Sequence, residues 1–251
     1  MLQHSTKTII VFLSLLINFT VKSQDSDQLA TLTIVDNTPS SSHNYLMRLY
    51  SDSVEVSSGI YKGNEYLFYS YRMDGHPFFY SDDLSIGDIL FDGILYKNVE
   101  FYYDTYLQQI ILEHDKLSFA ITIENDLIDY FKIFDHHYYK LEADSNETIK
   151  EGFYDLLVDG EVKLYAKRSK SLQKNIENQE VHQWFDIEDK HYVFKDGIYL
   201  KVKKKGSLLK ILKDKKKVLK SHIKQQKITF GKFPEKGLAR TIEYYNKLQQ
   251  Q

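Results

Sequence analysis

Four Asp-Gly dipeptides, beginning at Asp74, Asp92, Asp159 and Asp196, recur through the middle of the chain. Both central residues of a type I′ turn need a positive φ, which Gly adopts freely and Asp tolerates, so this dipeptide favours tight β-hairpins. Three of the four lie between apolar runs, in DILFDGILY, YDLLVDGEVKLY and YVFKDGIYLKV. The sequence therefore predicts an antiparallel β-rich domain over residues 45–205, built from hairpins as a curved sheet, a sandwich or a half-barrel.

Further strand-like segments fill the stretches between these turns. VEFYYDTYLQQIIL, LSFAITI and LIDYFKIFDHHYYKL each have the pattern of a strand or a strand pair. The chain has 20 tyrosines and 15 phenylalanines, and both residue types suit half-buried positions on a sheet. Several apolar runs lack a clean alternation, so we expect parts of both sheet faces to be covered.

Residues 206–251 change to a helical period. Ser207 and Asp214 are predicted N-caps, and the apolar stripe of this part consists of Leu208, Ile211, Leu212, Val218, Leu219, His222 and Ile223. Pro234 suits the first position of a last helix, whose inward stripe is Leu238, Ile242, Tyr245 and Leu248. We therefore expect an α+β protein that ends in two basic amphipathic helices packed on the sheet.

Residues 1–23 have the features of a secretory signal peptide. Lys7 precedes the apolar segment IIVFLSLLI, and Val21 and Ser23 stand at the two positions that a signal peptidase reads. An uncleaved membrane anchor is the less favoured alternative, because this segment is too short to span ~30 Å of hydrocarbon. We predict cleavage after Ser23, a loose polar lead-in over residues 24–44 and a short helix after it.

The chain contains no cysteine. This excludes disulfide bonds, catalysis by a thiol, zinc sites built on sulfur and lipid attachment at an N-terminal cysteine. An exported protein without disulfides depends on its core for stability. Export itself is compatible with the periplasm, with association with the outer membrane, or with release from the cell.

Charge is divided unevenly along the chain. Residues 24–160 carry 25 acids and 8 bases, a net charge of −17, whereas residues 161–251 carry 10 acids and 23 bases, a net charge of +13. Lys203–Lys227 alone contains eleven lysines and one acid. An asymmetry of this size steers the association of a protein with charged partners.

The lysine run has three interpretations. The favoured one is the solvated face of a helix, or a face directed at the acidic part of the same chain. Contact with an envelope protein, a surface polymer or, peripherally, an anionic membrane comes second, since the apolar stripe lacks Trp and Phe. Nucleic acid is not expected, because exported proteins rarely meet it and no recognition motif is present. The predicted interaction surface consists of Lys203, Lys204, Lys205, Lys210, Lys213, Lys216, Lys217 and Lys220.

No familiar catalytic motif occurs in the sequence. G-x-S-x-G, G-x-x-x-x-G-K-[ST], G-x-G-x-x-G and H-E-x-x-H are all missing, so we assign no catalytic residue, cofactor or metal ligand and lean away from an enzyme. His136 and His137 are adjacent on a predicted strand and should point to opposite faces, which makes a shared metal ion difficult.

Asp104 and His136 are weak candidates for a pocket. An acid within the aromatic strand FYYDTY has a raised pKa if it is buried. Alternation nevertheless places Tyr102, Asp104 and Tyr106 on one face, and we favour a solvated position for that face.

Several segments together resemble a group of exported proteins of unknown function from Gram-negative bacteria. The similar stretches are GIYKGNEYLFY, GHPFFYSDDLSIGDILFDGILYKNVEFYYDTYLQQIIL, GFYDLLVDGEVKLYAKRSK and the region from LKDKKKVLKSHIKQQKITFGK to EYYNKL. The resemblance covers most of the mature chain. It implies an envelope location and a β-rich fold with a helical C-terminal part, and it brings no site residues.

Two functions follow as hypotheses. The first is a non-enzymatic envelope protein that binds another protein or a surface polymer, because the chain has a marked charge asymmetry and aromatic-rich strands. The alternative is a binder of a small molecule or lipid, or an enzyme acting on one, with an aromatic pocket in the curved sheet.

Overall fold

The computed structural model describes residues 57–250, apart from residues 62, 70–72, 114–118 and 178. The predicted signal peptide, the lead-in over residues 24–44 and the short helix after it lie outside the described residues. All the described residues belong to one unit, His43–Gln251.

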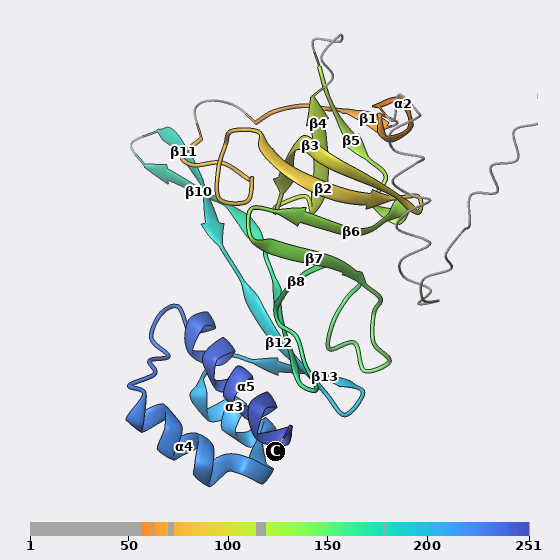
Figure 1. Cartoon of the computed structure of the whole chain (residues 1–251). Coiled ribbons are helices and arrows are strands. Elements are labelled where there is room, and N and C mark those ends of the chain that lie inside the picture. Colours follow the sequence, from red (N-terminus) through yellow and green to blue (C-terminus); the bar gives the residue numbers. More distant parts are fainter. Residues whose placement is uncertain (1–56, 62, 70–72, 114–118, 178, 251) are drawn as a thin grey trace, which may run out of the picture. The chain divides into compact units, whose positions relative to one another are not determined.

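Within the described residues, eleven strands form one open sheet in the order β1-β5-β4-β3-β2-β6-β7-β8-β9-β12-β13, and β10 and β11 form a separate two-stranded hairpin (Figure 1). All of these strand pairs are antiparallel. The strands are β1 Gly63–Tyr66, β2 Ser85–Phe91, β3 Ile94–Asp104, β4 Gln109–Glu113, β5 Ala120–Ile123, β6 Ile128–Ile133, β7 His136–Leu141, β8 Gly152–Val158, β9 Lys163–Lys167, β10 Lys170–Glu177, β11 Glu180–Ile187, β12 Lys190–Lys195 and β13 Ile198–Val202. The predicted fold class, mainly antiparallel β with a helical C-terminal part, is confirmed.

Two of the Asp-Gly dipeptides form the expected two-residue turns. Asp92 and Gly93 join β2 to β3 with φ of 50° and 73°, and Asp196 and Gly197 join β12 to β13 with φ of 53° and 80°. Positive φ at both residues is the signature of the type I′ turn, so the local chemistry sets the register of these hairpins.

The turn at Asp159-Gly160 differs because a helix packs on it. β8 ends at Val158 and β9 begins at Lys163, so the connection is longer than two residues. The Asn246 side chain accepts a hydrogen bond from the backbone N–H of Val162 at 3.0 Å and donates one to its carbonyl at 2.8 Å. Gly160 has a φ of 148°, and a Cβ there would lie 2.5 Å from Asn246 Nδ2. The helix thus replaces turn chemistry as the determinant of this loop.

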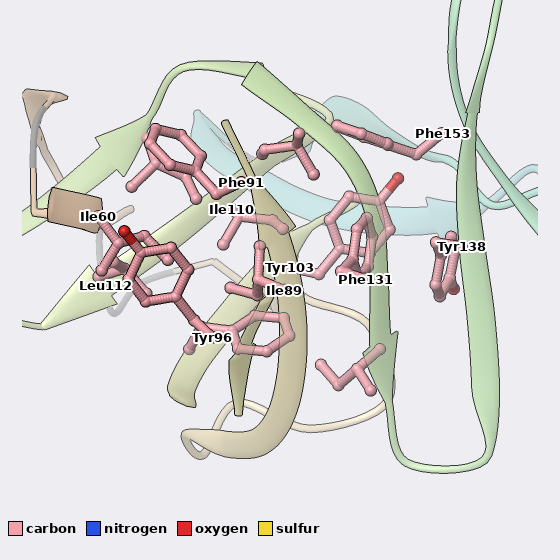
Figure 2. Packing of buried hydrophobic residues seen from close by; sticks show 14 of the residues in the cluster. Ile60, Ile89, Phe91, Tyr96, Tyr103, Ile110, Leu112, Phe131, Tyr138 and Phe153 are labelled. Atoms are coloured by element: carbon pink, nitrogen blue, oxygen red, sulfur yellow. The ribbon is translucent and has the colours of Figure 1, made fainter. Parts of the chain in front are cut away.

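The sheet encloses a cluster of side chains that we call the aromatic core (Figure 2). Its members come from the N-terminal strands of the sheet as far as β8, and from the segments just before β1 and β2. Phe131 stacks on Tyr138 with ring centroids 4.5 Å apart and meets Tyr103 edge-on at 4.9 Å. The members are Ile60, Phe79, Ile89, Phe91, Tyr96, Phe101, Tyr103, Ile110, Leu112, Ile121, Ile123, Ile128, Phe131, Ile133, Tyr138 and Phe153.

A second cluster, the aliphatic core, lies where the C-terminal helices cover the sheet. Helix α5 contacts β8 and β9, and α3 contacts β13. The members are Val158, Val162, Leu164, Val193, Val202, Leu208, Leu209, Leu212, Leu219, Ile223, Ile228, Leu238, Ile242 and Tyr245. The predicted apolar stripes supply most of the helical members, because residues three and four apart share one helix face.

The helices of the described part are α2 Ser57–Ile60, α3 Lys205–Ile211, α4 Lys216–Gln225 and α5 Glu235–Gln249, with short 3₁₀ turns at η1 Asn125–Leu127 and η2 Lys213–Lys215. The first predicted basic helix is therefore divided into α3 and α4, and the chain leaves the helical conformation at Leu212, with φ −94° and ψ 47°. None of the described helices is long and apolar enough to cross a membrane.

The two predicted N-caps were wrong. Ser207 lies inside α3, where its hydroxyl accepts hydrogen bonds from the backbone N–H groups of Lys203 and Lys204, both at 3.1 Å. Asp214 lies in η2 and accepts a hydrogen bond from the Tyr245 hydroxyl at 2.9 Å. Asp214 thus bonds to the last helix, 31 residues further along the chain, and no local pattern predicts this contact.

Candidate functional site

Arg168, between β9 and β10, is the centre of a buried charged cluster. Only 5% of the residue is exposed. Its guanidinium donates to Asp155 of β8 through Nε at 2.9 Å and Nη2 at 2.6 Å, and to Asp189 through Nη1 at 2.8 Å. It also donates to both carboxylate oxygens of Glu235, the first residue of α5. These charge-assisted bonds attach the sheet to the start of the last helix.

Two histidines extend this cluster. His136 Nδ1 lies 2.7 Å from Asp155 Oδ2, and His191 Nε2 lies 3.0 Å from Glu235 Oε2. We call the six residues Asp155, Arg168, Asp189, Glu235, His136 and His191 the Arg168 junction. Because three carboxylates face one guanidinium, the junction has a net charge of −2 when both histidines are neutral.

Hydrogen bonds and ion pairs within the junction favour the charged forms of Glu235 and Arg168. Burial alone would raise the pKa of Glu235, but hydrogen bonds from His191 and Arg168 outweigh this and lower it to about 2. Burial opposes the charge of Arg168 as well, and its carboxylate partners nevertheless raise the pKa of the guanidinium. Glu235 therefore accepts hydrogen bonds and is a poor proton donor near neutral pH.

Two polar atoms beside the junction have no hydrogen-bond partner among the described residues. They are Asp155 Oδ1 and the Tyr138 hydroxyl, both buried. Tyr138 and Asp155 are directly opposite each other on β7 and β8, so their side chains lie on the same face of the sheet. Burial raises the pKa of the Tyr138 hydroxyl well above its usual value.

An open cleft of about 730 Å³ lies beside the junction. Its floor includes Arg168, Asp189, His191 and Glu235. Its rim carries three large apolar side chains that are mostly exposed: Tyr80 at 63%, Ile187 at 71% and Phe233 at 79%. The remaining lining residues are Glu188, Lys190, Lys201, Val202, Lys203, Gly231, Lys232 and Pro234.

The eight lysines of the predicted interaction surface are all exposed. Lys203 and Lys204 follow β13, Lys205 and Lys210 belong to α3, Lys213 to η2, and Lys216, Lys217 and Lys220 to α4. We call this set the basic surface. Across the described part of the chain, none of the eight lies within ion-pair distance of a carboxylate. Lys203 belongs both to the basic surface and to the cleft lining.

Asp104 is buried, with 0% exposure, so the expected solvated position was wrong. It is the last residue of β3, and its carboxylate accepts hydrogen bonds from the backbone N–H groups of Tyr106 and Leu107, each at 2.8 Å. The Tyr66 hydroxyl donates a third bond at 2.8 Å. Burial raises the pKa of the Asp104 carboxyl, although these three bonds act in the opposite direction. Asp104 lines neither the cleft nor the junction, and it stabilises the β3–β4 turn.

His136 and His137 reach different partners, as alternation along a strand predicts. His136 belongs to the junction, whereas His137 Nδ1 lies 2.7 Å from the Tyr130 hydroxyl. Over the described residues, no three or more Asp, Glu or His side chains are arranged to hold a metal ion.

Apart from His136, the sequence analysis missed the members of the junction. One signal was present: the chain has four arginines among 33 basic residues, and Arg168 stands at the end of a strand beside lysines. An arginine in that position is suited to bidentate bonds with buried carboxylates, which lysine cannot form. Its partners are up to 67 residues away in the chain, so no local pattern identifies them.

Comparison of the chain with protein-family models, with curated proteins and with solved structures finds no match.

Proposed function

We propose that the protein is exported to the cell envelope, where it binds an anionic protein or surface polymer through the basic surface without catalysing a reaction. The observation that carries this proposal is that the eight lysines are exposed and that no carboxylate of the described residues pairs with them. Their charge is therefore free for an external partner.

Helices α3 and α4 hold five of these lysines in a fixed arrangement. Leu208, Leu209 and Leu212 of the α3 region and Leu219 and Ile223 of α4 are buried in the aliphatic core, so the opposite sides of these helices face solvent. A preorganised array of charges binds a polyanion with a smaller loss of conformational entropy than a flexible tail does. Each lysine near an anionic surface contributes about 1 kcal/mol, an attraction that added salt screens.

The Arg168 junction supports a non-catalytic role. Its carboxylates are engaged by Arg168, and the pKa of Glu235 is lowered to about 2. A general acid or base works best with a pKa near the working pH.

The alternative site, an aromatic pocket in the curved sheet, has weaker support. Rings of the aromatic core contact one another in stacked and edge-on pairs, so these rings are already engaged with each other (Figure 2).

Affinity purification from envelope fractions at low and high salt tests the proposal. The mature chain, residues 24–251, is compared with the triple variant Lys210→Gln, Lys216→Gln, Lys217→Gln. The matched control replaces three exposed lysines outside the helices: Lys97→Gln, Lys150→Gln, Lys174→Gln. Both variants lose three positive charges, so only the location of the charge differs.

We expect a partner that is retained at low salt, released at high salt and lost with the helical variant but not with the control. Equal losses in the two variants would show a dependence on net charge alone. That result would overturn the proposal. A partner whose binding changes neither with salt nor in the helical variant would overturn it as well. Recovery of lipid vesicles in place of a protein or polymer would replace the partner class with an anionic membrane.

A further inference from the structure

We propose that the cleft beside the Arg168 junction is a binding site for an anionic amphiphile, a molecule with a negatively charged head and a single alkyl chain. This site shares only Lys203 with the partner surface proposed above. Three features of the cleft carry the inference: its apolar rim, its unpaired lysines and its size.

The apolar rim comes from three separate segments. Tyr80 precedes β2, Ile187 ends β11, and Phe233 precedes α5, yet all three line the same opening. Single exposed apolar residues are common on proteins, but a group of them around one hollow marks a binding surface. The Tyr80 ring is held in place by stacking on Phe79 at 4.0 Å, so this part of the rim is preorganised.

The lysines supply the charge complementarity. Lys190, Lys201, Lys203 and Lys232 line the cleft, are exposed and have no ion-pair partner in the described part of the chain. The acids of the lining are already engaged. Arg168 binds Asp189 and Glu235, and Glu188 accepts a hydrogen bond from Ser171 at 2.8 Å. The lining carries five bases and three acids, a net charge of +2 when His191 is neutral, which favours an anion.

The size of the cleft fits a small amphiphile. Its volume of about 730 Å³ is within the range of small-molecule sites. The cleft combines an apolar rim with a few polar groups on its floor and walls, which is the usual composition of such sites. A carboxylate and a phosphate head share the chemistry that the lysines recognise, so the experiment distinguishes between them.

Isothermal titration of the mature chain, residues 24–251, tests this site. The probes are dodecanoate, dodecyl phosphate, the neutral dodecyl maltoside and acetate, each below its micelle concentration. We expect one molecule of dodecanoate or dodecyl phosphate to bind, with a negative heat-capacity change from burial of the chain. Dodecyl maltoside and acetate should each bind at least ten-fold more weakly, and the tighter of the two anions identifies the preferred head.

Variants of the apolar rim and of the cleft lysines separate the apolar contribution to binding from the electrostatic contribution. Phe233→Ser and Ile187→Ser should each weaken dodecanoate binding about ten-fold, because each removes a large apolar contact. Lys190→Gln and Lys232→Gln should weaken the anionic probes about three-fold and leave the binding of dodecyl maltoside unchanged. Phe119→Ser removes an aromatic side chain that is 43% exposed elsewhere, and it should have no effect.

Failure of this proposal is distinguishable from failure of the proposed function. The variant Lys210→Gln, Lys216→Gln, Lys217→Gln should bind dodecanoate as the natural chain does, whereas Phe233→Ser should retain the envelope partner. Equal affinity for dodecanoate and dodecyl maltoside, equal effects of Phe233→Ser and Phe119→Ser, or no binding of either anion would overturn the amphiphile site. Binding of an acidic peptide in place of dodecanoate would overturn it as well.

Discussion

The two largest cores among the described residues are built from different residues. Eight of the sixteen buried members of the aromatic core are Phe or Tyr, whereas Tyr245 is the single aromatic among the fourteen buried members of the aliphatic core. The aromatic core is enclosed almost entirely by strands, and the aliphatic core lies between strands and helices. A curved sheet without helical cover needs large side chains to fill its interior, whereas an amphipathic helix brings a stripe of Leu and Ile.

Strand β8 connects the two cores. It contributes Phe153 to the aromatic core and Val158 to the aliphatic core, and Asp155 lies between them. Asp155 is the buried carboxylate to which Arg168 donates two hydrogen bonds. A charged junction therefore lies where aromatic packing changes to aliphatic packing, in a position to couple the two cores.

Arg168→Met should produce the largest effect, a loss of about 3–5 kcal/mol in the free energy of unfolding, because it leaves the buried carboxylate of Asp155 and two half-buried carboxylates without their cation. Urea unfolding followed by circular dichroism measures the loss. Arg240→Met changes an exposed arginine and should stay within about 0.5 kcal/mol. A single weakened transition would show that the junction couples the cores, whereas two separate transitions would show that they unfold independently. An unchanged midpoint would contradict the role of Arg168.

Replacing one buried apolar side chain by another should cost more stability in the aromatic core than in the aliphatic core. Phe131→Leu removes ring contacts with Tyr103, Tyr138 and Phe153, and we expect a loss of about 2–3 kcal/mol. Leu238→Met in the aliphatic core keeps the side-chain volume and should cost less than about 1.5 kcal/mol. Urea unfolding of both variants measures the difference. Equal losses would show that ring geometry contributes nothing beyond apolar burial.

Acid should weaken the junction before it affects either core directly. The folded-state pKa of Glu235, about 2, lies below its ordinary value of 4.5, so its stabilisation is present above about pH 4.5 and is lost as the pH falls towards 2. Nearly a third of the side chain is exposed, so we expect a contribution of about 1–2 kcal/mol. Glu235→Gln should lower stability at pH 7 by this amount, and the difference should vanish near pH 2. Glu243→Gln, at an exposed position of α5, is the control.

Lys167 should give the smallest effect, in the opposite direction. Burial lowers its pKa from 10.5 to about 8, and its Nζ donates to the Phe153 carbonyl at 3.1 Å. Because the folded state binds this proton less tightly, stability should rise as the pH increases from 8 to 10.5. Lys167→Met removes the buried charge and should stabilise the protein by about 1 kcal/mol at pH 7. The gain should disappear above pH 10.5 in urea unfolding, and a gain that persists there would have another cause.

The hairpins and the helical stripes were predictable because their signals are local. Asp-Gly at residues 92–93 and 196–197 encodes positive φ within two residues, and the burial of Leu238, Ile242 and Tyr245 in α5 follows from a spacing of three and four. The turn at Gly160 was less predictable, because Asn246 packs on it from 86 residues further along the chain. The φ preferences of the turn residues determine the conformation of a turn only where no distant part of the chain packs on it.

The candidate site residues likewise divide into those whose exposure was predictable from a local pattern and those whose burial was not. Exposure of the five lysines in α3 and α4 follows from helical periodicity, since the apolar stripe faces the core and the other side faces water. Burial of Asp104 does not follow from strand alternation, because the strand ends there and the carboxylate turns inward to the N–H groups of Tyr106 and Leu107. Alternation along β3 therefore misplaces this last residue.

The type of sheet, the positions of its tight turns and the amphipathic character of the C-terminal helices are therefore properties of the amino-acid sequence, because they depend on φ preferences and on spacing along the chain. The Arg168 junction and the cleft beside it depend on the tertiary structure. A charge is stable inside a protein only when its partners surround it, and the partners of Arg168 come from β8, the β11–β12 loop and the first turn of α5. Only the folded chain brings these segments together.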